Sequence, residues 1–168
     1  MTVIDKITYP MRKIFPNAIL GLLIVILAVL IYTSACNNDG NDIPLPFVNI
    51  TIDPNSTIYQ ELNVVGGWRY LDESDGVLPP SRGLIVYRLS TMEFMAYDRI
   101  PPYKPDSCCV TSTNCTKLIV GNNYPFVVDT CTDSKYLIID GSPSSGPSGQ
   151  FLLTYVAEYD GITLYIHN

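Results

Sequence analysis

The sequence FLLTYVAEYDGITLYI, residues 151–166, decides the fold. It contains two runs in which apolar and polar residues alternate, and Asp160-Gly161 stands between them. Alternation with a period of two is typical of a strand with one buried face, and an Asp-Gly pair between two such runs is a strong β-hairpin signal. The stretch therefore predicts strands over Phe151–Tyr159 and Ile162–Ile166, joined by a tight turn.

The rest of the chain after Cys36 also favours strands. The 132 residues that follow Cys36 are enough for one domain, and none of them shows a 3.6-residue apolar period. Tyr, Val, Ile and Thr are frequent, and Pro and Gly recur at short intervals. The spacing predicts an all-β domain, a small antiparallel sandwich or barrel. Its further candidate strands are Phe47–Ile52, Glu61–Val65, Leu84–Leu89, Phe94–Asp98, Lys117–Val120, Phe126–Asp129 and Tyr136–Ile139.

The first 36 residues have the order of an export signal. Basic residues come first, Ala18–Ile31 is a run of 14 apolar residues, and Thr33-Ser34-Ala35-Cys36 follows it. The basic cluster fixes the orientation, so everything after Cys36 is expected outside the cytoplasm. The run is short for a full span, which needs roughly 20 residues. A removed signal peptide is therefore expected, with a retained single-pass anchor as the alternative.

Thr33-Ser34-Ala35-Cys36 resembles the lipobox of bacterial lipoproteins, in which the cysteine becomes the acylated first residue of the mature protein. The match departs at Thr33, where Leu is usual. The resemblance implies lipidation at Cys36 and a protein held on a membrane of the cell envelope, facing the periplasm or the cell surface. The expected organisation is a signal peptide over 1–36, a flexible tether over 37–45 and a β domain over 46–168.

Charge and composition exclude several functions. After Cys36, seven Lys and Arg residues stand against fifteen Asp and Glu residues, a net charge of −8. Such a surface argues against nucleic acid and against an electrostatic hold on anionic lipid. His167 is the only histidine, which argues against a Ser-His-Asp triad or a multi-histidine metal site. No glycine-rich phosphate loop is present, so nucleotide binding has no support.

Two clusters have metal-ligand side chains. Asp72-Glu73-Ser74-Asp75 is expected to be a solvated acidic loop, with calcium binding as the alternative. Outside the cytoplasm an even number of cysteines usually forms disulfides. Adjacent cysteines pair only with strain, so each of the neighbours is expected to bond elsewhere, one to each of the other two. A tetrathiolate metal site is the rival interpretation. The four cysteines are Cys108, Cys109, Cys115 and Cys131.

The segment Ser134–Ser148 resembles the second cluster-binding loop of Rieske iron–sulfur domains. The family pattern runs G-S-x-F/Y, four residues, Gly, four residues, G-P-A. Ser148 stands here where Ala is usual, and the Leu and Tyr that follow in the family are also present at the same spacing. The positions in register are Ser134, Tyr136, Gly141, Gly146, Pro147, Leu152 and Tyr155. The resemblance implies an ordered turn in the Ser- and Gly-rich segment, where Gly141 and Gly146 supply backbone freedom.

The resemblance extends upstream and covers roughly residues 60–168. Gly83–Arg88 and Glu93–Arg99 look like the two strands that lead to the first cluster loop, and Asp98–Tyr103 sits where the family has D-x-x-C-P-H. The chain resembles more closely a set of short lipoproteins of Bacteroidetes bacteria that carry this fold. The implied fold is the Rieske type of small antiparallel β domain.

All four cluster-ligand positions differ from the family. Pro101 and Tyr103 stand at the Cys and His positions of the first loop, and Asp129 and Thr132 stand at those of the second. A Rieske cluster needs two thiolates on one iron and two imidazoles on the other, so the usual cluster is not expected. Cys131 matches a cysteine that joins the two loops through a disulfide in some Rieske proteins, which implies Cys108 or Cys109 as its partner.

Together these features predict a membrane-anchored, non-enzymatic binding or structural module without a cofactor. A cell-envelope protein is the expected partner. The tip formed by Pro101–Tyr103 and Tyr124–Phe126 is a candidate contact site, although the favoured interpretation is that these aromatic residues fill the former cluster cavity. The rival function is electron transfer through a 2Fe-2S or other metal centre at the cysteine loops, as part of an oxidoreductase system.

Overall fold

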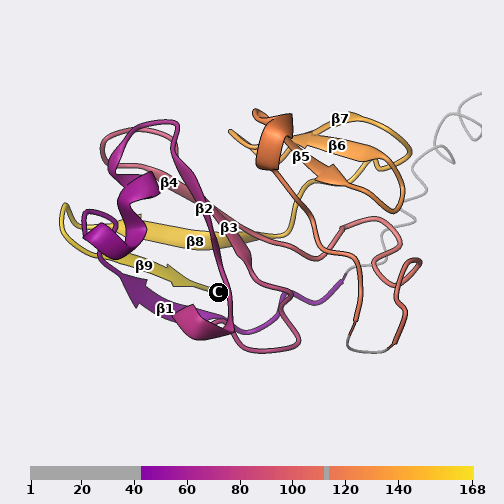
Figure 1. The fold of residues 1–168 in the computed structure, drawn as a ribbon, viewed down its shortest axis with the longest axis horizontal. Coiled ribbons are helices and arrows are strands. Elements are labelled where there is room, and N and C mark those ends of the chain that lie inside the picture. Colours follow the sequence, from indigo (N-terminus) through magenta and orange to yellow (C-terminus); the bar gives the residue numbers. More distant parts are fainter. Residues whose placement is uncertain (1–42, 112–113) are drawn as a thin grey trace, which may run out of the picture. The chain divides into compact units, whose positions relative to one another are not determined.

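The computed structural model describes residues 43–111 and 114–168 (Figure 1). The export signal, Cys36 and most of the predicted tether lie outside the described residues. Within the described residues, no helix has the length and apolar character that crossing a membrane would require. The described part is built from antiparallel strands with three short 3₁₀ helices, which confirms the predicted all-β class.

The C-terminal hairpin forms as predicted and lies within a six-stranded sheet. Strands β8 (Thr154–Tyr159) and β9 (Leu164–His167) pair antiparallel, with Tyr159 opposite Leu164. One oxygen of the Asp160 carboxylate accepts the backbone N–H groups of Ile162 and Thr163 at 2.8 and 2.7 Å. The loop is thus four residues long, and the strand pairing begins two residues later than the Asp-Gly pair predicts, because Asp160 satisfies the turn's own N–H groups.

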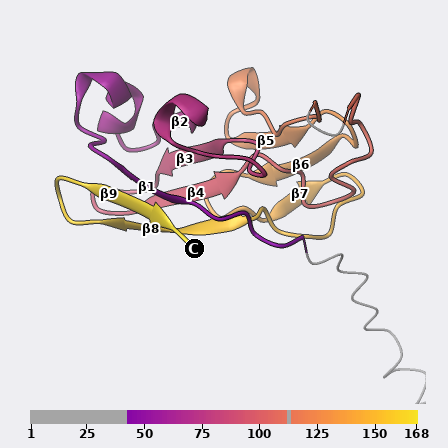
Figure 2. The same ribbon diagram turned by 90° about the horizontal axis from the view of Figure 1, so that it is seen from below.

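The six-stranded sheet has the order β1-β9-β8-β4-β3-β2 (Figures 1 and 2). Strand β1 (Asn49–Ile52) forms one edge of this sheet. Strand β3 (Leu84–Arg88) is buried along its whole length, and β4 (Phe94–Asp98) pairs with it. Strand β2 (Trp68–Leu71) forms the other edge and pairs with β3 alone among the described strands.

A second sheet of three strands is inserted in the chain between β4 and β8. The strand order of this sheet is the order along the chain: β5 (Phe126–Asp129), β6 (Ser134–Leu137) and β7 (Pro143–Ser145). The Ser- and Gly-rich segment therefore contains a strand. At Gly146, φ is +92° and an added Cβ would lie 2.6 Å from the Ser134 Cα, so only glycine fits this position.

The sheets enclose two clusters of buried residues. The larger lies within the six-stranded sheet and includes Leu71, Val86, Tyr155 and Ile166. The smaller lies between β3 and β4 on one side and the three-stranded sheet on the other. Three residues of the quoted sequence motif belong to these clusters, each with less than 4% of its surface exposed: Tyr136, Leu152 and Tyr155. These motif residues are therefore part of the packing.

The structure corrects some predicted strands. Glu61–Val65 is not a strand, because a 3₁₀ helix, η1 (Thr57–Asn63), occupies most of it. The buried Arg88 side chain donates to the Leu62 carbonyl at 3.0 Å and holds this turn in place. Segment 117–120 contributes only one isolated bridge, Ile119 to Val128. Strands β2 and β7 were not predicted; their four and three residues are too short to show a period.

Candidate functional site

The loop after β5 is closed by Asp129, the position matched to a cluster cysteine. Its carboxylate is fully buried and uses both oxygens. Oδ1 accepts the Cys131 N–H at 2.9 Å, and Oδ2 accepts the Thr132 hydroxyl at 2.6 Å. The Thr132 hydroxyl lies 2.9 Å from the Ser134 hydroxyl. The two matched positions of this loop therefore hydrogen-bond to each other, and this pair has a structural role.

The loop after β4 holds the other two matched positions. Pro101 is buried and Tyr103 is partly buried. The Lys104 ammonium lies 5.1 Å from the centre of the Tyr103 ring, within the range of a cation–π contact. Proline has no side-chain donor atom, so Pro101 contributes packing only.

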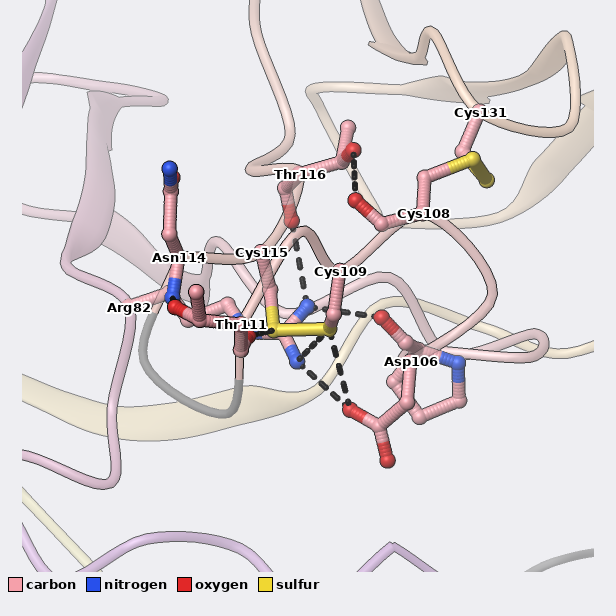
Figure 3. Close-up of a disulfide and its surroundings, with 10 residues drawn as sticks. Arg82, Asp106, Cys108, Cys109, Thr111, Asn114, Cys115, Thr116 and Cys131 are labelled. Carbon is pink, nitrogen blue, oxygen red and sulfur yellow. Dashed lines mark hydrogen bonds and ion pairs between the residues drawn. A yellow bond between two sulfur atoms is a disulfide. The ribbon is translucent and has the colours of Figure 1, made fainter.

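The four cysteines of these loops form two disulfides (Figure 3). Cys108 is joined to Cys131, 23 residues away, and this bond links the loop after β4 to the loop after β5. Cys109 is joined to Cys115, six residues away, within the loop after β4. The expectation that the adjacent cysteines bond elsewhere is confirmed, and the structure settles the pairing that the sequence left open.

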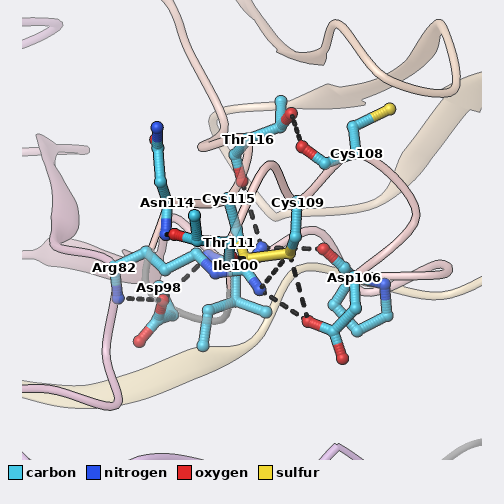
Figure 4. A network of polar contacts seen from close by, with 11 residues as sticks. Arg82, Asp98, Ile100, Asp106, Cys108, Cys109, Thr111, Asn114, Cys115 and Thr116 are labelled. Carbon is cyan, nitrogen blue, oxygen red and sulfur yellow. Dashed lines mark hydrogen bonds and ion pairs between the residues drawn. A yellow bond between two sulfur atoms is a disulfide. The ribbon is translucent and has the colours of Figure 1, made fainter.

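The loop after β4 is anchored by Arg82 and Asp98 (Figure 4). The Arg82 guanidinium donates to the carbonyls of Pro105 and Thr116 at 2.8 and 3.1 Å and pairs with Asp106 at 2.8 Å. The fully buried Asp98 carboxylate accepts the Ile100 N–H at 2.8 Å. This end of the domain is therefore fixed by polar contacts as well as by disulfides.

Asp98 also binds Tyr155 of the C-terminal hairpin. The Tyr155 hydroxyl donates to the second carboxylate oxygen at 2.9 Å and lies 3.0 Å from the Pro46 carbonyl. Burial, together with the Asp98 carboxylate, raises the pKa of Tyr155, which stays protonated as a donor at neutral pH. Tyr155 thereby ties the loop region to the start of the domain.

An open groove of about 780 Å³ lies beside the edge strand β2. Its rim includes Val64, Val65 and Tyr124, of which 61%, 56% and 48% of the surface is exposed. The Trp68 and Tyr70 rings meet edge to face, with centroids 5.0 Å apart. The whole lining consists of Glu61, Val64, Val65, Gly66, Gly67, Trp68, Arg69, Tyr70 and Tyr124. Its walls are mainly aromatic and aliphatic, which is typical of binding surfaces.

The backbone beneath the groove requires glycine. Gly66 donates to the Arg88 carbonyl at 2.8 Å, and the Gly67 carbonyl accepts the Arg88 N–H at 2.9 Å. A Cβ added at Gly67 would overlap the Glu61 carbonyl oxygen. Above it, Arg69 pairs with Glu61 at 2.9 Å. Gly66 and Gly67 thus lie opposite a single residue of β3, Arg88. This β-bulge bends the chain toward η1 and opens the groove.

The two segments of the predicted contact tip, 101–103 and 124–126, lie at different places on the domain. Tyr124 follows the 3₁₀ turn η3 (Gly121–Asn123), drawn as the orange helical turn, and lines the groove beside β2. The loop with Pro101–Tyr103 and the cysteines lies at the opposite end of the three-stranded sheet in both views (Figures 1 and 2). Burial and a hydrogen bond with Tyr124 raise the pKa of Tyr87.

The other candidate residues have local roles. Asp72 caps the 3₁₀ turn η2 (Glu73–Asp75), and hydrogen bonds from the side chain and backbone of Ser74 hold the pKa of Asp72 below its usual range. The His167 imidazole lies 3.9 Å from the exposed Glu158 carboxylate. Among the described residues, one cluster has metal-ligand spacing: Asp106, Cys109 and Cys115, with ligand atoms within 4.8 Å of one another.

No protein-family model matches the chain, and no curated protein matches it significantly. The function is therefore argued from the groove, the loops and the sequence. Sequence reasoning missed the groove because its walls come from two segments about 55 residues apart. The signals that were available are the single tryptophan of the chain, Trp68, and the adjacent Gly66-Gly67.

Proposed function

We propose that this chain is a lipid-anchored binding module that works outside the cytoplasm, and that the groove beside β2 is its binding surface. The observation that carries the proposal is the exposure of Val64, Val65 and Tyr124 around an aromatic floor. An exposed apolar patch next to a rigid sheet edge usually marks an interaction site. The groove volume of about 780 Å³ is within the range of ligand sites.

The ligand that fits best is an extended segment of a partner protein in the cell envelope. Strand β2 is a sheet edge, and an added strand gains main-chain hydrogen bonds there. The side chains of Trp68 and Tyr70 stand beside this edge and offer contact area to alternate side chains of such a segment. The chain after Cys36 carries a net charge of −8, which favours a segment containing Lys or Arg.

The resemblance supports a Rieske-like domain that lacks its cluster. Three observations agree with this origin: the Cys108–Cys131 bond joins the two matched loops, Asp129 uses both carboxylate oxygens within its own loop, and Pro101 is buried. In this proposal the former site is now a structural brace, and binding takes place elsewhere on the domain.

Peptide arrays read by Trp68 fluorescence test the proposal. Trp68 is the only tryptophan, so its emission reports on the groove alone. The full chain in detergent is probed with extended peptides that alternate apolar and basic residues, and with oligosaccharides. We expect peptides to shift the Trp68 emission, and Tyr124→Ala to weaken binding at least tenfold. Tyr165→Ala, at a tyrosine that is 42% exposed on β9, is the matched control. Binding that leaves Trp68 unchanged would contradict the proposal.

The anchor is tested by Cys36→Ala. We expect unprocessed precursor or a protein that is released from membranes, because acylation at this residue supplies the hold. Processed and fully membrane-bound Cys36→Ala protein would show that the lipoprotein assignment is wrong. Labelling of intact cells then places the domain on the periplasmic side or at the surface.

A second candidate is electron transfer through a metal centre at the cysteine loops. The observation in its favour is the spacing of Asp106, Cys109 and Cys115. It requires the Cys109–Cys115 bond to be reduced first, because a disulfide sulfur is a poor ligand. Absorption and EPR spectra of protein purified without air, with iron and zinc analysis, decide it. Colourless protein with neither metal nor free thiol removes this candidate.

A further inference from the structure

The two disulfides have different electrostatic surroundings. Arg82 places Nη2 3.8 Å from the Cys109 sulfur, and the Asp106 carboxylate lies 3.7 Å from the same atom (Figure 3). Among the described residues, neither sulfur of the Cys108–Cys131 bond has a charged side chain at hydrogen-bonding distance. A cationic neighbour stabilises a thiolate and therefore makes that cysteine a better leaving group.

Arg82 is held in position by the rest of the loop. Only 14% of its side chain is exposed, and its guanidinium donates to the carbonyls of Pro105 and Thr116. A charge fixed by such contacts keeps its place when the neighbouring sulfur becomes a thiolate, so little reorganisation is needed. Figure 4 shows the guanidinium between the loop carbonyls, the Asp106 carboxylate and the Cys109 sulfur.

Chain topology also distinguishes the two bonds. Access does not, because Cys109 and Cys115 are partly exposed and Cys108 is exposed. The Cys109–Cys115 bond closes a loop with a sequence separation of six, whereas Cys108–Cys131 spans 23 residues and joins two loops. Cys109–Cys115 lies within one loop, so opening it separates no elements of the fold.

We propose that Cys109–Cys115 is a thiol–disulfide exchange site for an external dithiol. A thiolate of the dithiol attacks the Cys115 sulfur, a mixed disulfide forms, and the S–S bond breaks to release Cys109 as a thiolate beside Arg82. The second thiolate of the dithiol then attacks the mixed disulfide and releases Cys115. In total the dithiol is oxidised to a disulfide and loses two electrons and two protons, and Cys109 and Cys115 gain them. This activity does not depend on the groove.

A metal ion is the competing occupant of the reduced site. Asp106, Cys109 and Cys115 would give a cation two thiolates and one carboxylate. The Arg82 guanidinium lies 2.8 Å from the Asp106 oxygen and close to the Cys109 sulfur, so it opposes a second positive charge there. The same positive charge assists a thiolate. The surroundings therefore favour exchange over metal binding.

Titration of the full chain with dithiothreitol, followed by alkylation and mass spectrometry, tests the proposal. We expect Cys109 and Cys115 to be alkylated at a dithiol-to-disulfide ratio at least tenfold lower than Cys108 and Cys131. Opening of both bonds together, or of Cys108–Cys131 first, would overturn it. Addition of Zn²⁺ to the reduced protein is a further arm: protection of both thiols from alkylation at equimolar metal would also overturn it, because the site would then be a metal site.

Asp106→Asn is a variant that is expected to favour the reduced form of the Cys109–Cys115 bond. Loss of the carboxylate leaves the Arg82 charge uncompensated beside the Cys109 sulfur, so the thiolate is stabilised, the reduced form is favoured severalfold and Cys109 is alkylated faster. Glu73→Gln, at an exposed carboxylate in η2, is the matched control and leaves both readouts unchanged. An equal effect of the two variants, or no effect of Asp106→Asn, would contradict the role of Arg82.

Discussion

The two ends of the three-stranded sheet differ in burial, in disulfide bonding and in polar contacts. Where β5 ends, Asp129 is buried, Cys131 is bonded to Cys108, and Arg82 and Asp98 hold the adjoining loop. Before β5 begins, Tyr124 is half exposed and faces an open groove. The end that the sequence motif marks is thus filled and braced, whereas the end with free apolar surface carries no motif. The buried residues of the motif therefore serve packing at this end.

The largest effect is expected from Asp98→Ala at the braced end. The change leaves the Ile100 N–H and the Tyr155 hydroxyl without their buried acceptor, at a cost of roughly 4 kcal/mol in the free energy of unfolding. Tyr155→Phe keeps the bond to Ile100 and is expected to cost about 1.5 kcal/mol. Urea unfolding measures both. Equal losses for the two variants would show that the carboxylate does not organise this end.

The next effect comes from the disulfides. Replacing both Cys108 and Cys131 by Ala is expected to cost about 3.5 kcal/mol, and replacing both Cys109 and Cys115 about 2.4 kcal/mol, because the first bond closes the longer loop. Thermal unfolding of the two double variants provides the comparison. A larger loss from the second pair would contradict both the bracing role of Cys108–Cys131 and the ease of opening Cys109–Cys115.

A smaller effect is expected at Thr132. Thr132→Val removes the hydroxyl that donates to Asp129 and contacts Ser134, and it costs about 1 kcal/mol. Thr130→Val, at an exposed position in the same loop, is the control and is expected to stay within about 0.5 kcal/mol of the parent. If the two substitutions cost the same, the Asp129–Thr132 contact does not close the loop.

The smallest effect on stability is expected at the open end. Tyr124→Ala removes a half-exposed ring that fills no core and one hydrogen bond, that with Tyr87, so the free energy of unfolding falls by under about 1 kcal/mol. The same variant loses peptide binding in the groove, because large aromatic side chains dominate binding energy. Paired unfolding and binding measurements show whether this residue serves the ligand or the fold. A loss of stability comparable with Asp98→Ala would remove the contrast between the two ends.

The sequence predicted the strands whose signal is local. The C-terminal hairpin has alternation and an Asp-Gly turn, and β3 and β4 have continuous apolar runs, so their positions follow from the residues themselves. The expected bonding of the adjacent cysteines to other partners was also correct. The bonding pattern between particular sulfurs was not predictable, because it depends on how the loops fold in space.

The groove could not be predicted from local patterns. It exists because Gly67 lies against the Glu61 carbonyl and because the chain returns to place Tyr124 beside Gly66. The segment Glu61–Val65 has strand-like composition, but Arg88 hydrogen-bonds to the Leu62 carbonyl and the segment becomes part of a 3₁₀ turn. Tertiary contacts thus override propensity at the place where the groove forms.

Site-directed photo-crosslinking in cells tests most directly whether the open end is the one that binds. A photoreactive phenylalanine is placed at Val64 in the groove or at Tyr103 in the loop after β4, in the whole 168-residue chain. The account predicts a protein adduct from Val64 whose cross-linked peptide can be sequenced, its loss when Tyr124→Ala is added, and no adduct from Tyr103. An adduct from Tyr103 alone, or one from Val64 that persists with Tyr124→Ala, would contradict it.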